Sequence, residues 1–392
     1  MKYNCIICHY DEIGTKGQNR INFERQLIDN IHRQLAKNLS SSNFKVKRVY
    51  GRIIIEITEF FDTEIEQAKK ILTRVFGLAN ISLAVCVKQN IEVIIQTALE
   101  LVASEKYENF RVTTCRSDKN FPLTSLEVNI KVGEAIYETL HKAVKLKDSE
   151  LTCYIELVDK KAYLYTEKIA GAGGLPVGSS GRAVCLLSGG IDSPVSAYYA
   201  AKRGLSLSCV HFHSYPHTGK ESIYKVKELA SIINSYCPDM ELYLCPFINA
   251  QKKIFAISPD KLRIILYRRF MMRVAEKISA LVSAEVLVTG EALGQVASQT
   301  VSNMSVVQEA VNLLILRPLI GFDKKEIISK AQAIGTYETS IQPHDDCCVV
   351  FMPKHPETKA KMHEIQAIEK DLDIDGIVND CVAQCEIIRV KY

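Results

Sequence analysis

Two adjacent glycines lie between a serine and an aspartate in the run SGGIDS at Ser188–Ser193, a pattern that can bind phosphate groups. The apolar run 183–187 predicts a buried strand, and residues 195–203 predict a helix that Gly204 ends. We expect Ser193 to cap this helix and Pro194 to be its first residue. A glycine turn at a helix N-terminus directs backbone N–H groups at an anion. The run therefore predicts a phosphate site, although it has neither the Lys-Ser/Thr of a Walker A loop nor the glycine spacing of a dinucleotide fingerprint.

A second stretch with chemical potential is 343–351, where Cys347 and Cys348 follow two aspartates. Its polar, proline-started composition predicts a surface loop that presents a thiol. A nucleophilic cysteine needs thiolate character and access to solvent. The two aspartates disfavour a thiolate, so His344 or a nearby arginine would have to compensate. The alternative is a pair of buried cysteines without a chemical role.

A third stretch, 110–125, combines basic side chains with an aromatic residue and a proline. Arg111, Arg116 and Lys119 lie where a predicted strand runs into a polar loop, and Thr124 or Ser125 is placed to cap the next helix. Basic and aromatic side chains together suit contacts to RNA phosphates and exposed bases. A plain solvent-facing turn explains the same residues equally well.

The elements that must position these stretches fall into three parts. Strands and helices up to residue 87 follow the order β-α-β-β-α-β of a ferredoxin-like unit, and a small α/β unit follows to residue 165. Glycine, serine and proline are dense in 171–181, which predicts a linker. Strands and helices then alternate, which predicts a doubly wound parallel sheet. We expect boundaries at 1–60, 61–167, 168–180 and 181–392, with the second helix and last strand of the first part shared with the next.

Composition sets the class of protein. The 392 residues are 47% hydrophobic and 24% charged, which is typical of a chain with a sizeable core. No apolar run approaches the ~20 residues of a membrane span, and no signal peptide is evident. Thirteen scattered cysteines do not fit a secreted disulfide framework, so we expect a cytoplasmic protein. Residues 1–182 carry 26 Lys and Arg against 22 Asp and Glu, a mild excess that is compatible with a polyanionic partner.

Taken in order over essentially the whole chain, these stretches resemble the tRNA 4-thiouridine synthases of the ThiI family, in the form without a rhodanese domain. Residues 188–193 resemble the PP-loop of ATP pyrophosphatases. The polar turn 11–20 and the stretch 110–125 resemble the ferredoxin-like and THUMP parts, and Asp346-Cys347-Cys348 resembles the late cysteine loop. The resemblance implies a fold of a ferredoxin-like unit, a THUMP α/β domain and a doubly wound PP-loop domain. It also implies an activity, the ATP-dependent conversion of uridine 8 of tRNA to 4-thiouridine.

The resemblance implies roles for single residues. Cys347 would carry the persulfide sulfur, Asp192 would help to hold Mg²⁺, and Cys209 would be the resolving thiol, with Cys348 as its alternative. Arg111, Arg116 and Lys119 would contact RNA. The residues that would line the ATP are Leu186, Leu187, Ser188, Gly189, Gly190, Ser193, His211, Phe212, Arg268, Gly290 and Gln299.

Partners and alternatives follow from the same comparison. A cysteine desulfurase would supply persulfide in the absence of a rhodanese domain, and a sulfur-carrier protein of thiamine thiazole synthesis is a further substrate that the family suggests. A homodimer is compatible with the resemblance. Two other functions stay open: a PP-loop ligase or amidotransferase acting on a small molecule, and an RNA-binding THUMP adaptor whose PP-loop is inert.

Overall fold

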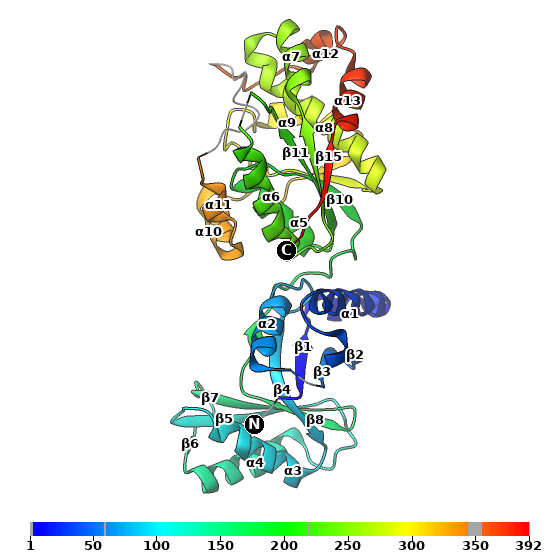
Figure 1. Ribbon diagram of the computed structural model, residues 1–392. Helices are drawn as coiled ribbons and strands as arrows, with labels where there is room; N and C mark the ends of the chain where they lie inside the picture. The colour runs from blue at the N-terminus through cyan, green and yellow to red at the C-terminus, as the bar shows by residue number, and fades with distance from the viewer. Residues whose placement is uncertain (1–2, 59, 218, 344–354, 392) are drawn as a thin grey trace. The chain divides into compact units, whose positions relative to one another are not determined.

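The computed structural model describes residues 3–58, 60–217, 219–343 and 355–391. The chain forms two compact units, residues 1–176 and 177–392 (Figure 1). Each unit has its own sheet, of nine strands in the first and six in the second. No helix in the described ranges is long and apolar enough to cross a membrane.

The first unit begins with the predicted β-α-β-β-α-β order. Its strands pair antiparallel in the order β2-β3-β1-β4. Helix α1 buries Leu27, Ile31 and Leu35 against this sheet, as the spacing of its apolar residues predicts. The elements are β1 (Cys5–His9), α1 (Arg20–Ala36), β2 (Phe44–Val49), β3 (Arg52–Ile57), α2 (Asp62–Leu72) and β4 (Asn80–Lys88).

The rest of the first unit extends the same sheet through β4, which pairs with β1 and with β8. Thr124 caps α4: its Oγ1 accepts from the N–H of Glu127 (3.3 Å), and its own N–H donates to the Glu127 carboxylate (2.7 Å). The elements are α3 (Ile91–Ala103), β5 (Asn109–Arg116), α4 (Ser125–Leu140), β6 (Ala143–Val144), β7 (Leu151–Val158), β8 (Lys161–Tyr165) and β9 (Ile169–Ala170).

A buried ion cluster joins the two parts of this sheet. Glu156 on β7 accepts from Tyr165 (2.6 Å) and bonds His9 Nε2 (2.8 Å), while its second oxygen lies 3.0 Å from Arg52 Nε. Burial alone would raise the pKa of Glu156, but the hydrogen bond and charge of His9, together with Arg52, lower it to about 2. The carboxylate therefore stabilises the folded unit in its ionised form.

Glu156→Gln is expected to lower the stability of the first unit by ~3 kcal/mol near pH 7, because Arg52 keeps a buried charge without its partner. A carboxylate with a lowered folded-state pKa contributes stability above its ordinary pKa of 4.5 and loses it as pH falls toward about 2. The difference in Tm between the two proteins should therefore be largest above pH 5 and shrink below pH 4. A difference that stays constant from pH 7 to pH 3 would contradict this account.

The second unit has the predicted doubly wound architecture. Its sheet order is β14-β13-β10-β11-β12-β15, with α5 and α6 on one face and α8 and α13 on the other (Figure 1). All neighbours are parallel except β15, an antiparallel edge strand that the sequence did not predict. The strands are β10 (Arg182–Leu186), β11 (Ser206–His213), β12 (Glu241–Pro246), β13 (Val286–Val288), β14 (Leu314–Leu316) and β15 (Glu386–Arg389).

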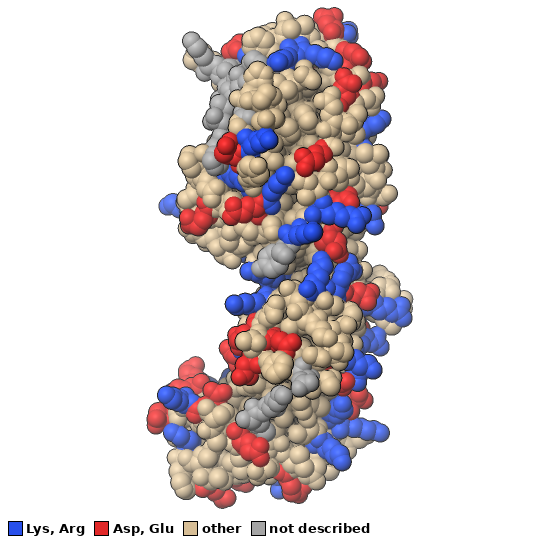
Figure 2. All heavy atoms as spheres, in the orientation of Figure 1, with Lys and Arg blue, Asp and Glu red and all other residues tan. Residues whose placement is uncertain are grey.

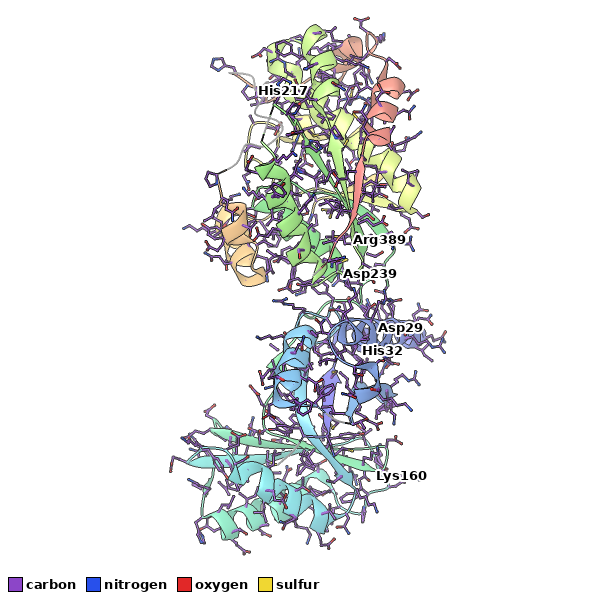
Figure 3. The ribbon with its side chains drawn as sticks, viewed as in Figure 1. Asp29, His32, Lys160, His217, Asp239 and Arg389 are labelled. Atoms are coloured by element: carbon purple, nitrogen blue, oxygen red, sulfur yellow. The ribbon has the colours of Figure 1, made fainter. Side chains whose placement is uncertain are left out.

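The helices of this unit surround a core centred on α8, which buries Leu266, Phe270 and Val274. They are α5 (Asp192–Lys202), α6 (Glu221–Asn234), α7 (Ile248–Ile257), α8 (Arg263–Val282), α9 (Val301–Gln308), α10 (Lys324–Ile334), α11 (Tyr337–Ser340), α12 (Met362–Glu369) and α13 (Ile374–Ala383). Figure 3 labels Asp29, His32 and Lys160 in the first unit, and His217, Asp239 and Arg389 in the second.

The glycine-rich stretch 171–181 is bonded into the fold on both sides. The N–H groups of Gly171 and Gly173 donate to Ala79 and Leu78, and those of Gly178 and Ser180 donate to Gly204. A Cβ on Gly171 would lie 2.3 Å from the Leu78 carbonyl oxygen. At this position the glycine permits close approach of two backbones.

Candidate active site

The PP-loop connects β10 to α5 and is closed by its own side chains. The N–H of Ser188 donates to Ser193 Oγ (2.9 Å), the two serine hydroxyls lie 3.1 Å apart, and the N–H of Gly190 donates to Ser188 Oγ (3.3 Å). Helix α5 begins at Asp192, and its N-cap residue Ile191 makes no side-chain cap. The expectations that Ser193 caps the helix and that Pro194 is its first residue are therefore wrong: they are the second and third residues of α5, and the Ser193 hydroxyl closes the loop.

A cavity of about 330 Å³ opens at this loop, beside the carboxyl ends of β10, β11 and β13. The carboxyl ends of parallel strands are where ligands of doubly wound sheets bind. Of the residues expected to line ATP, Gly189 alone is absent from the cavity wall. The wall contains Leu186, Leu187, Ser188, Gly190, Asp192, Ser193, His211, Phe212, Arg268, Gly290 and Gln299. The sequence did not indicate Val210, Ile264, Met271, Met272, Thr289, Glu291 and Ser298, which complete it.

His211 is a neutral wall residue. Its ring is 3% exposed and its Nδ1 lies 3.0 Å from the Leu187 carbonyl, so Nδ1 carries the proton and donates. Burial lowers the pKa of His211 to about 4, against a smaller opposing effect of that hydrogen bond. Nε2 is buried without a hydrogen-bond partner among the described residues, which leaves an acceptor for a ligand group.

Arg268 is held at the cavity wall by a buried carboxylate. Glu291, 1% exposed at its side chain, lies 2.9 Å from Arg268 Nη1 and 2.7 Å from Arg317 Nε, and accepts from Thr289 Oγ1 (3.0 Å). Two guanidinium groups compensate the desolvation of one carboxylate. Glu291 thereby orients Arg268, a phosphate-binding side chain by its chemistry, toward the cavity.

Glu291→Gln is expected to weaken ATP binding about tenfold, the free energy of one charge-assisted hydrogen bond, because Arg268 is no longer held by a charge. Titration calorimetry with ATP measures this. Glu276→Gln is the matched control. Glu276 lies on α8, as Arg268 does, but its carboxylate accepts from the backbone N–H groups of Asn312 and Leu313 and does not line the cavity. Unchanged ATP affinity in the Glu291 variant would show that Glu291 does not orient Arg268 for ATP binding.

Asp192 lies at the rim of the cavity with its side chain 19% exposed. Its Oδ1 is 2.7 Å from Lys324 Nζ, and its Oδ2 accepts from Gln295 Nε2 (2.6 Å). The sequence did not indicate Lys324 or Gln295, since they are more than 100 positions away. The described ranges contain no group of three His, Cys, Asp or Glu side chains that could hold a metal ion. One carboxylate beside a phosphate loop fits Mg²⁺, which usually binds one or two carboxylates together with substrate phosphates.

Of the three cysteines expected to take part in the reaction, the structure describes Cys209. Cys347 and Cys348 lie outside the described residues. Cys209 lies inside β11, fully buried, with its Sγ 3.4 Å from Met240 Sδ, and it does not line the cavity. A hydrogen bond with the Cys185 thiol, together with burial, raises the pKa of Cys209.

The three basic residues of 110–125 that were expected to contact RNA differ in their surroundings. Arg116 Nη1 donates to the carbonyls of Phe121 and Leu123 (both 3.0 Å), so it holds its own loop. Arg111 donates to Thr152 (3.0 Å), and Lys119 is exposed. Lys and Arg are interspersed with Asp and Glu on the face in view (Figure 2). The sequence did not single out Lys88, Lys160 and Lys161, which line a hollow of about 530 Å³; Lys160 lies at the turn between β7 and β8 (Figure 3).

Comparison with known proteins gives full-length matches. A family model described as thiamine biosynthesis protein (ThiI) matches residues 178–374, a ThiI ferredoxin-like domain matches 5–82, and a THUMP domain matches 88–167. A crystal structure of a 4-thiouridine synthetase–RNA complex with bound ATP is similar, with a TM-score of 0.89, 32% identity and coverage of 100% of both chains. The crystal structure of PH1313 from Pyrococcus horikoshii Ot3 has a TM-score of 0.65 at 26% identity, covering 85% of this chain and 99% of the other.

Curated relatives extend over the same length. A probable tRNA sulfurtransferase of Moorella thermoacetica is 38% identical over 390 residues, which cover 99% of this chain and 98% of the relative. Another, of Alkaliphilus metalliredigens, is 41% identical over 394 residues, with coverage of 99% and 98%. With matches at this identity over nearly its whole length, the chain belongs to the ThiI family.

Proposed function

We propose that the chain is an ATP-dependent tRNA sulfurtransferase that converts uridine 8 of tRNA to 4-thiouridine. The observation that carries the proposal is the single cavity at the PP-loop, which gathers ten of the eleven residues expected to contact ATP. The full-length similarity to a 4-thiouridine synthetase bound to RNA and ATP supports it. The first unit, with its THUMP match, would bind tRNA.

The reaction divides into two chemical steps. The uridine C4 oxygen attacks the α-phosphorus of ATP, and pyrophosphate leaves from the Ser188–Ser193 loop. Backbone N–H groups at the start of α5 would bind the phosphates, together with Arg268 of the cavity wall and Lys324, which lies 2.7 Å from Asp192. Mg²⁺ held by Asp192 would supply charge neutralisation at the phosphates. This adenylation turns a poor leaving group, the C4 oxygen, into AMP.

Sulfur then replaces AMP. The terminal sulfur of a persulfide on Cys347 attacks C4, the C4–O bond breaks, and AMP leaves. A second thiol attacks the Cys347 sulfur, which breaks the S–S bond, leaves 4-thiouridine and forms a disulfide that a cellular thiol reduces. Cys209 and Cys348 are the candidates for this second thiol. The burial of Cys209 weighs against it, because exchange requires access.

The described chain on both sides of residues 344–354 supports the role of Cys347. Before this segment, Ser340 Oγ donates to the Gly190 carbonyl of the PP-loop (3.4 Å), and Lys225 Nζ donates to the Gln342 carbonyl (2.8 Å). After it, Glu357 and Ala360 bond to Asn303, next to cavity residues Ser298 and Gln299. Both flanks are therefore fixed beside the ATP cavity.

The partners follow from this chemistry. A cysteine desulfurase would load Cys347 with persulfide sulfur, since the reaction consumes one sulfur atom per uridine. A sulfur-carrier protein of thiamine synthesis is a second acceptor that the same adenylation and sulfur transfer would serve.

ATP–pyrophosphate exchange by the purified protein, with and without tRNA, tests the proposal. We expect exchange that requires tRNA. Exchange without tRNA would instead indicate a ligase or amidotransferase acting on a small molecule. No exchange under either condition would indicate an RNA-binding protein with an inert loop.

A further inference from the structure

Asn303, in the first turn of α9, is fully buried, and both polar atoms of its side-chain amide form hydrogen bonds. Its Nδ2 donates to the carbonyl of Ala297 (2.9 Å) and to that of Glu357 (2.8 Å). Its Oδ1 accepts from the N–H of Ala360 (3.1 Å). One side chain thus joins two backbone segments that lie about 60 positions apart in the sequence.

The first of these segments is part of the ATP cavity. Ala297 directly precedes Ser298 and Gln299, which line the cavity, and Ser298 also accepts from Arg268 Nη1 (3.4 Å). The second segment is 357–360. Thr300, the N-cap of α9, adds a parallel link, because its hydroxyl donates to the Thr358 carbonyl (2.7 Å).

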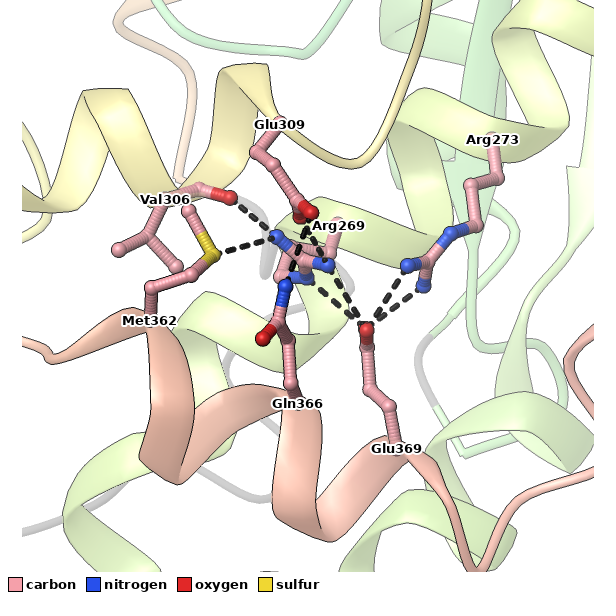
Figure 4. Close-up of polar contacts among 7 residues, drawn as sticks. All are labelled: Arg269, Arg273, Val306, Glu309, Met362, Gln366 and Glu369. Atoms are coloured by element: carbon pink, nitrogen blue, oxygen red, sulfur yellow. Dashed lines mark hydrogen bonds and ion pairs between the residues drawn. The ribbon is translucent and has the colours of Figure 1, made fainter.

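The chain that follows 357–360 is held at its far end by a buried ion cluster (Figure 4). Glu369, the last residue of α12, bonds Arg269 through two contacts of 2.8 Å and Arg273 through contacts of 2.6 and 2.8 Å. Burial alone would raise the pKa of Glu369, but Arg273 and Arg269 lower it to about 2. Glu369 is thus fixed on α8. Segment 357–360 is held by Asn303 and Thr300, and at Glu357 also by Lys261, whose carbonyl accepts from the Glu357 N–H (2.9 Å) and whose Nζ lies 3.4 Å from the Glu357 carboxylate.

We propose that Asn303 is a positioning residue that couples the wall of the ATP cavity to segment 357–360, and so couples adenylation to sulfur transfer. The inference rests on the proposed function, in which sulfur comes from Cys347, upstream of this segment. Misplacement of a reacting group by about 1 Å can cost a factor of 10² in rate. Adenylated uridine that waits too long for sulfur reacts with water, which returns uridine and AMP and wastes one ATP.

Asn303→Ala tests the proposal. The measured quantity is the ratio of 4-thiouridine formed to pyrophosphate released, with tRNA, ATP and a persulfide donor. We expect this ratio to fall about tenfold or more, while pyrophosphate release persists. A loss of general stability would lower both products together and leave the ratio unchanged, so the ratio separates positioning from folding.

Asn234→Ala is the matched control. Asn234 is also buried and also joins two segments, donating to the Val390 carbonyl and accepting from the Met240 N–H, but none of these three residues lines the cavity. Its variant should keep the wild-type ratio. Thr300→Val removes the Thr358 link together with the hydroxyl that accepts from the Asn303 N–H (3.2 Å), and it serves if Asn303→Ala does not fold. A severalfold fall in its ratio is expected.

A wild-type ratio in folded Asn303→Ala, or in Thr300→Val where that variant serves, would overturn the coupling. An Asn234→Ala ratio that falls as far would also overturn it, because the effect would then be general. If the wild-type protein releases pyrophosphate but forms no 4-thiouridine, the proposed function itself fails, which is a different result.

Discussion

Cys347→Ser should abolish 4-thiouridine formation, by a factor of about 10³ or more, and leave tRNA-dependent pyrophosphate release intact. A serine hydroxyl cannot carry a sulfane sulfur, so the second step has no donor. The first step needs the ATP cavity, whose described wall residues do not include this cysteine. The measurement compares two quantities in the same reaction. Thiolated nucleosides in digested tRNA report sulfur transfer, and released pyrophosphate reports adenylation.

Two other cysteine variants serve as a control and as a test of the resolving thiol. Cys115→Ser changes an exposed free thiol of the first unit and should be without effect. If Cys348 is the resolving thiol, Cys348→Ser should leave the transferred sulfur joined to Cys347 by a disulfide and release 4-thiouridine only when a reductant is added. If Cys209 is the resolving thiol, Cys348→Ser should be neutral. Multiple-turnover sulfur transfer by Cys347→Ser would remove Cys347 from its proposed role.

Gly290→Ala should weaken ATP binding about 10- to 100-fold, the equivalent of the 1–3 kcal/mol that overpacking usually costs. A Cβ at Gly290 would lie 2.8 Å from Ser193 N, 2.9 Å from Ser193 Cα and 3.0 Å from the Asp192 carbonyl carbon. These are backbone atoms of the PP-loop helix, which cannot turn aside as a flexible side chain can. The substitution therefore separates β13 from the loop that binds the phosphates.

Gly321→Ala is the matched control for this prediction. A Cβ on Gly321 meets no heavy atom within 4 Å, and Gly321 does not line the cavity. Its ATP affinity by titration calorimetry should equal that of the wild type. Equal affinity of Gly290→Ala and the wild type would show that the PP-loop is not the ATP site.

The sequence was sufficient for the parts of this protein that local patterns determine. The alternation of strands and helices predicted the doubly wound sheet, and the glycines predicted a turn between a strand and a helix, which lies between β10 and α5. The antiparallel edge strand β15 could not be predicted, because its four residues are mostly exposed and carry no apolar alternation. The role of Ser193 was predicted wrongly, because a serine before a proline fits a helix cap as well as a loop closure.

Long-range contacts account for what was missed in the site. The sequence did not indicate Glu291, because only the fold brings Arg268 and Arg317 to it. Asn303 has no distinctive sequence pattern, and its three bonds depend on segments up to 57 positions away. Cys209 was expected to be the resolving thiol, but it is the fourth residue of β11, is buried and does not line the cavity.

The most direct test of the account is the nucleoside content of a tRNA transcript after incubation with the purified protein, ATP, magnesium and a cysteine desulfurase with cysteine. The account predicts 4-thiouridine at position 8, formed only when ATP is present and accompanied by one pyrophosphate per thiolated base. Unmodified uridine at position 8, in a reaction where the protein demonstrably binds both ATP and tRNA, would contradict it.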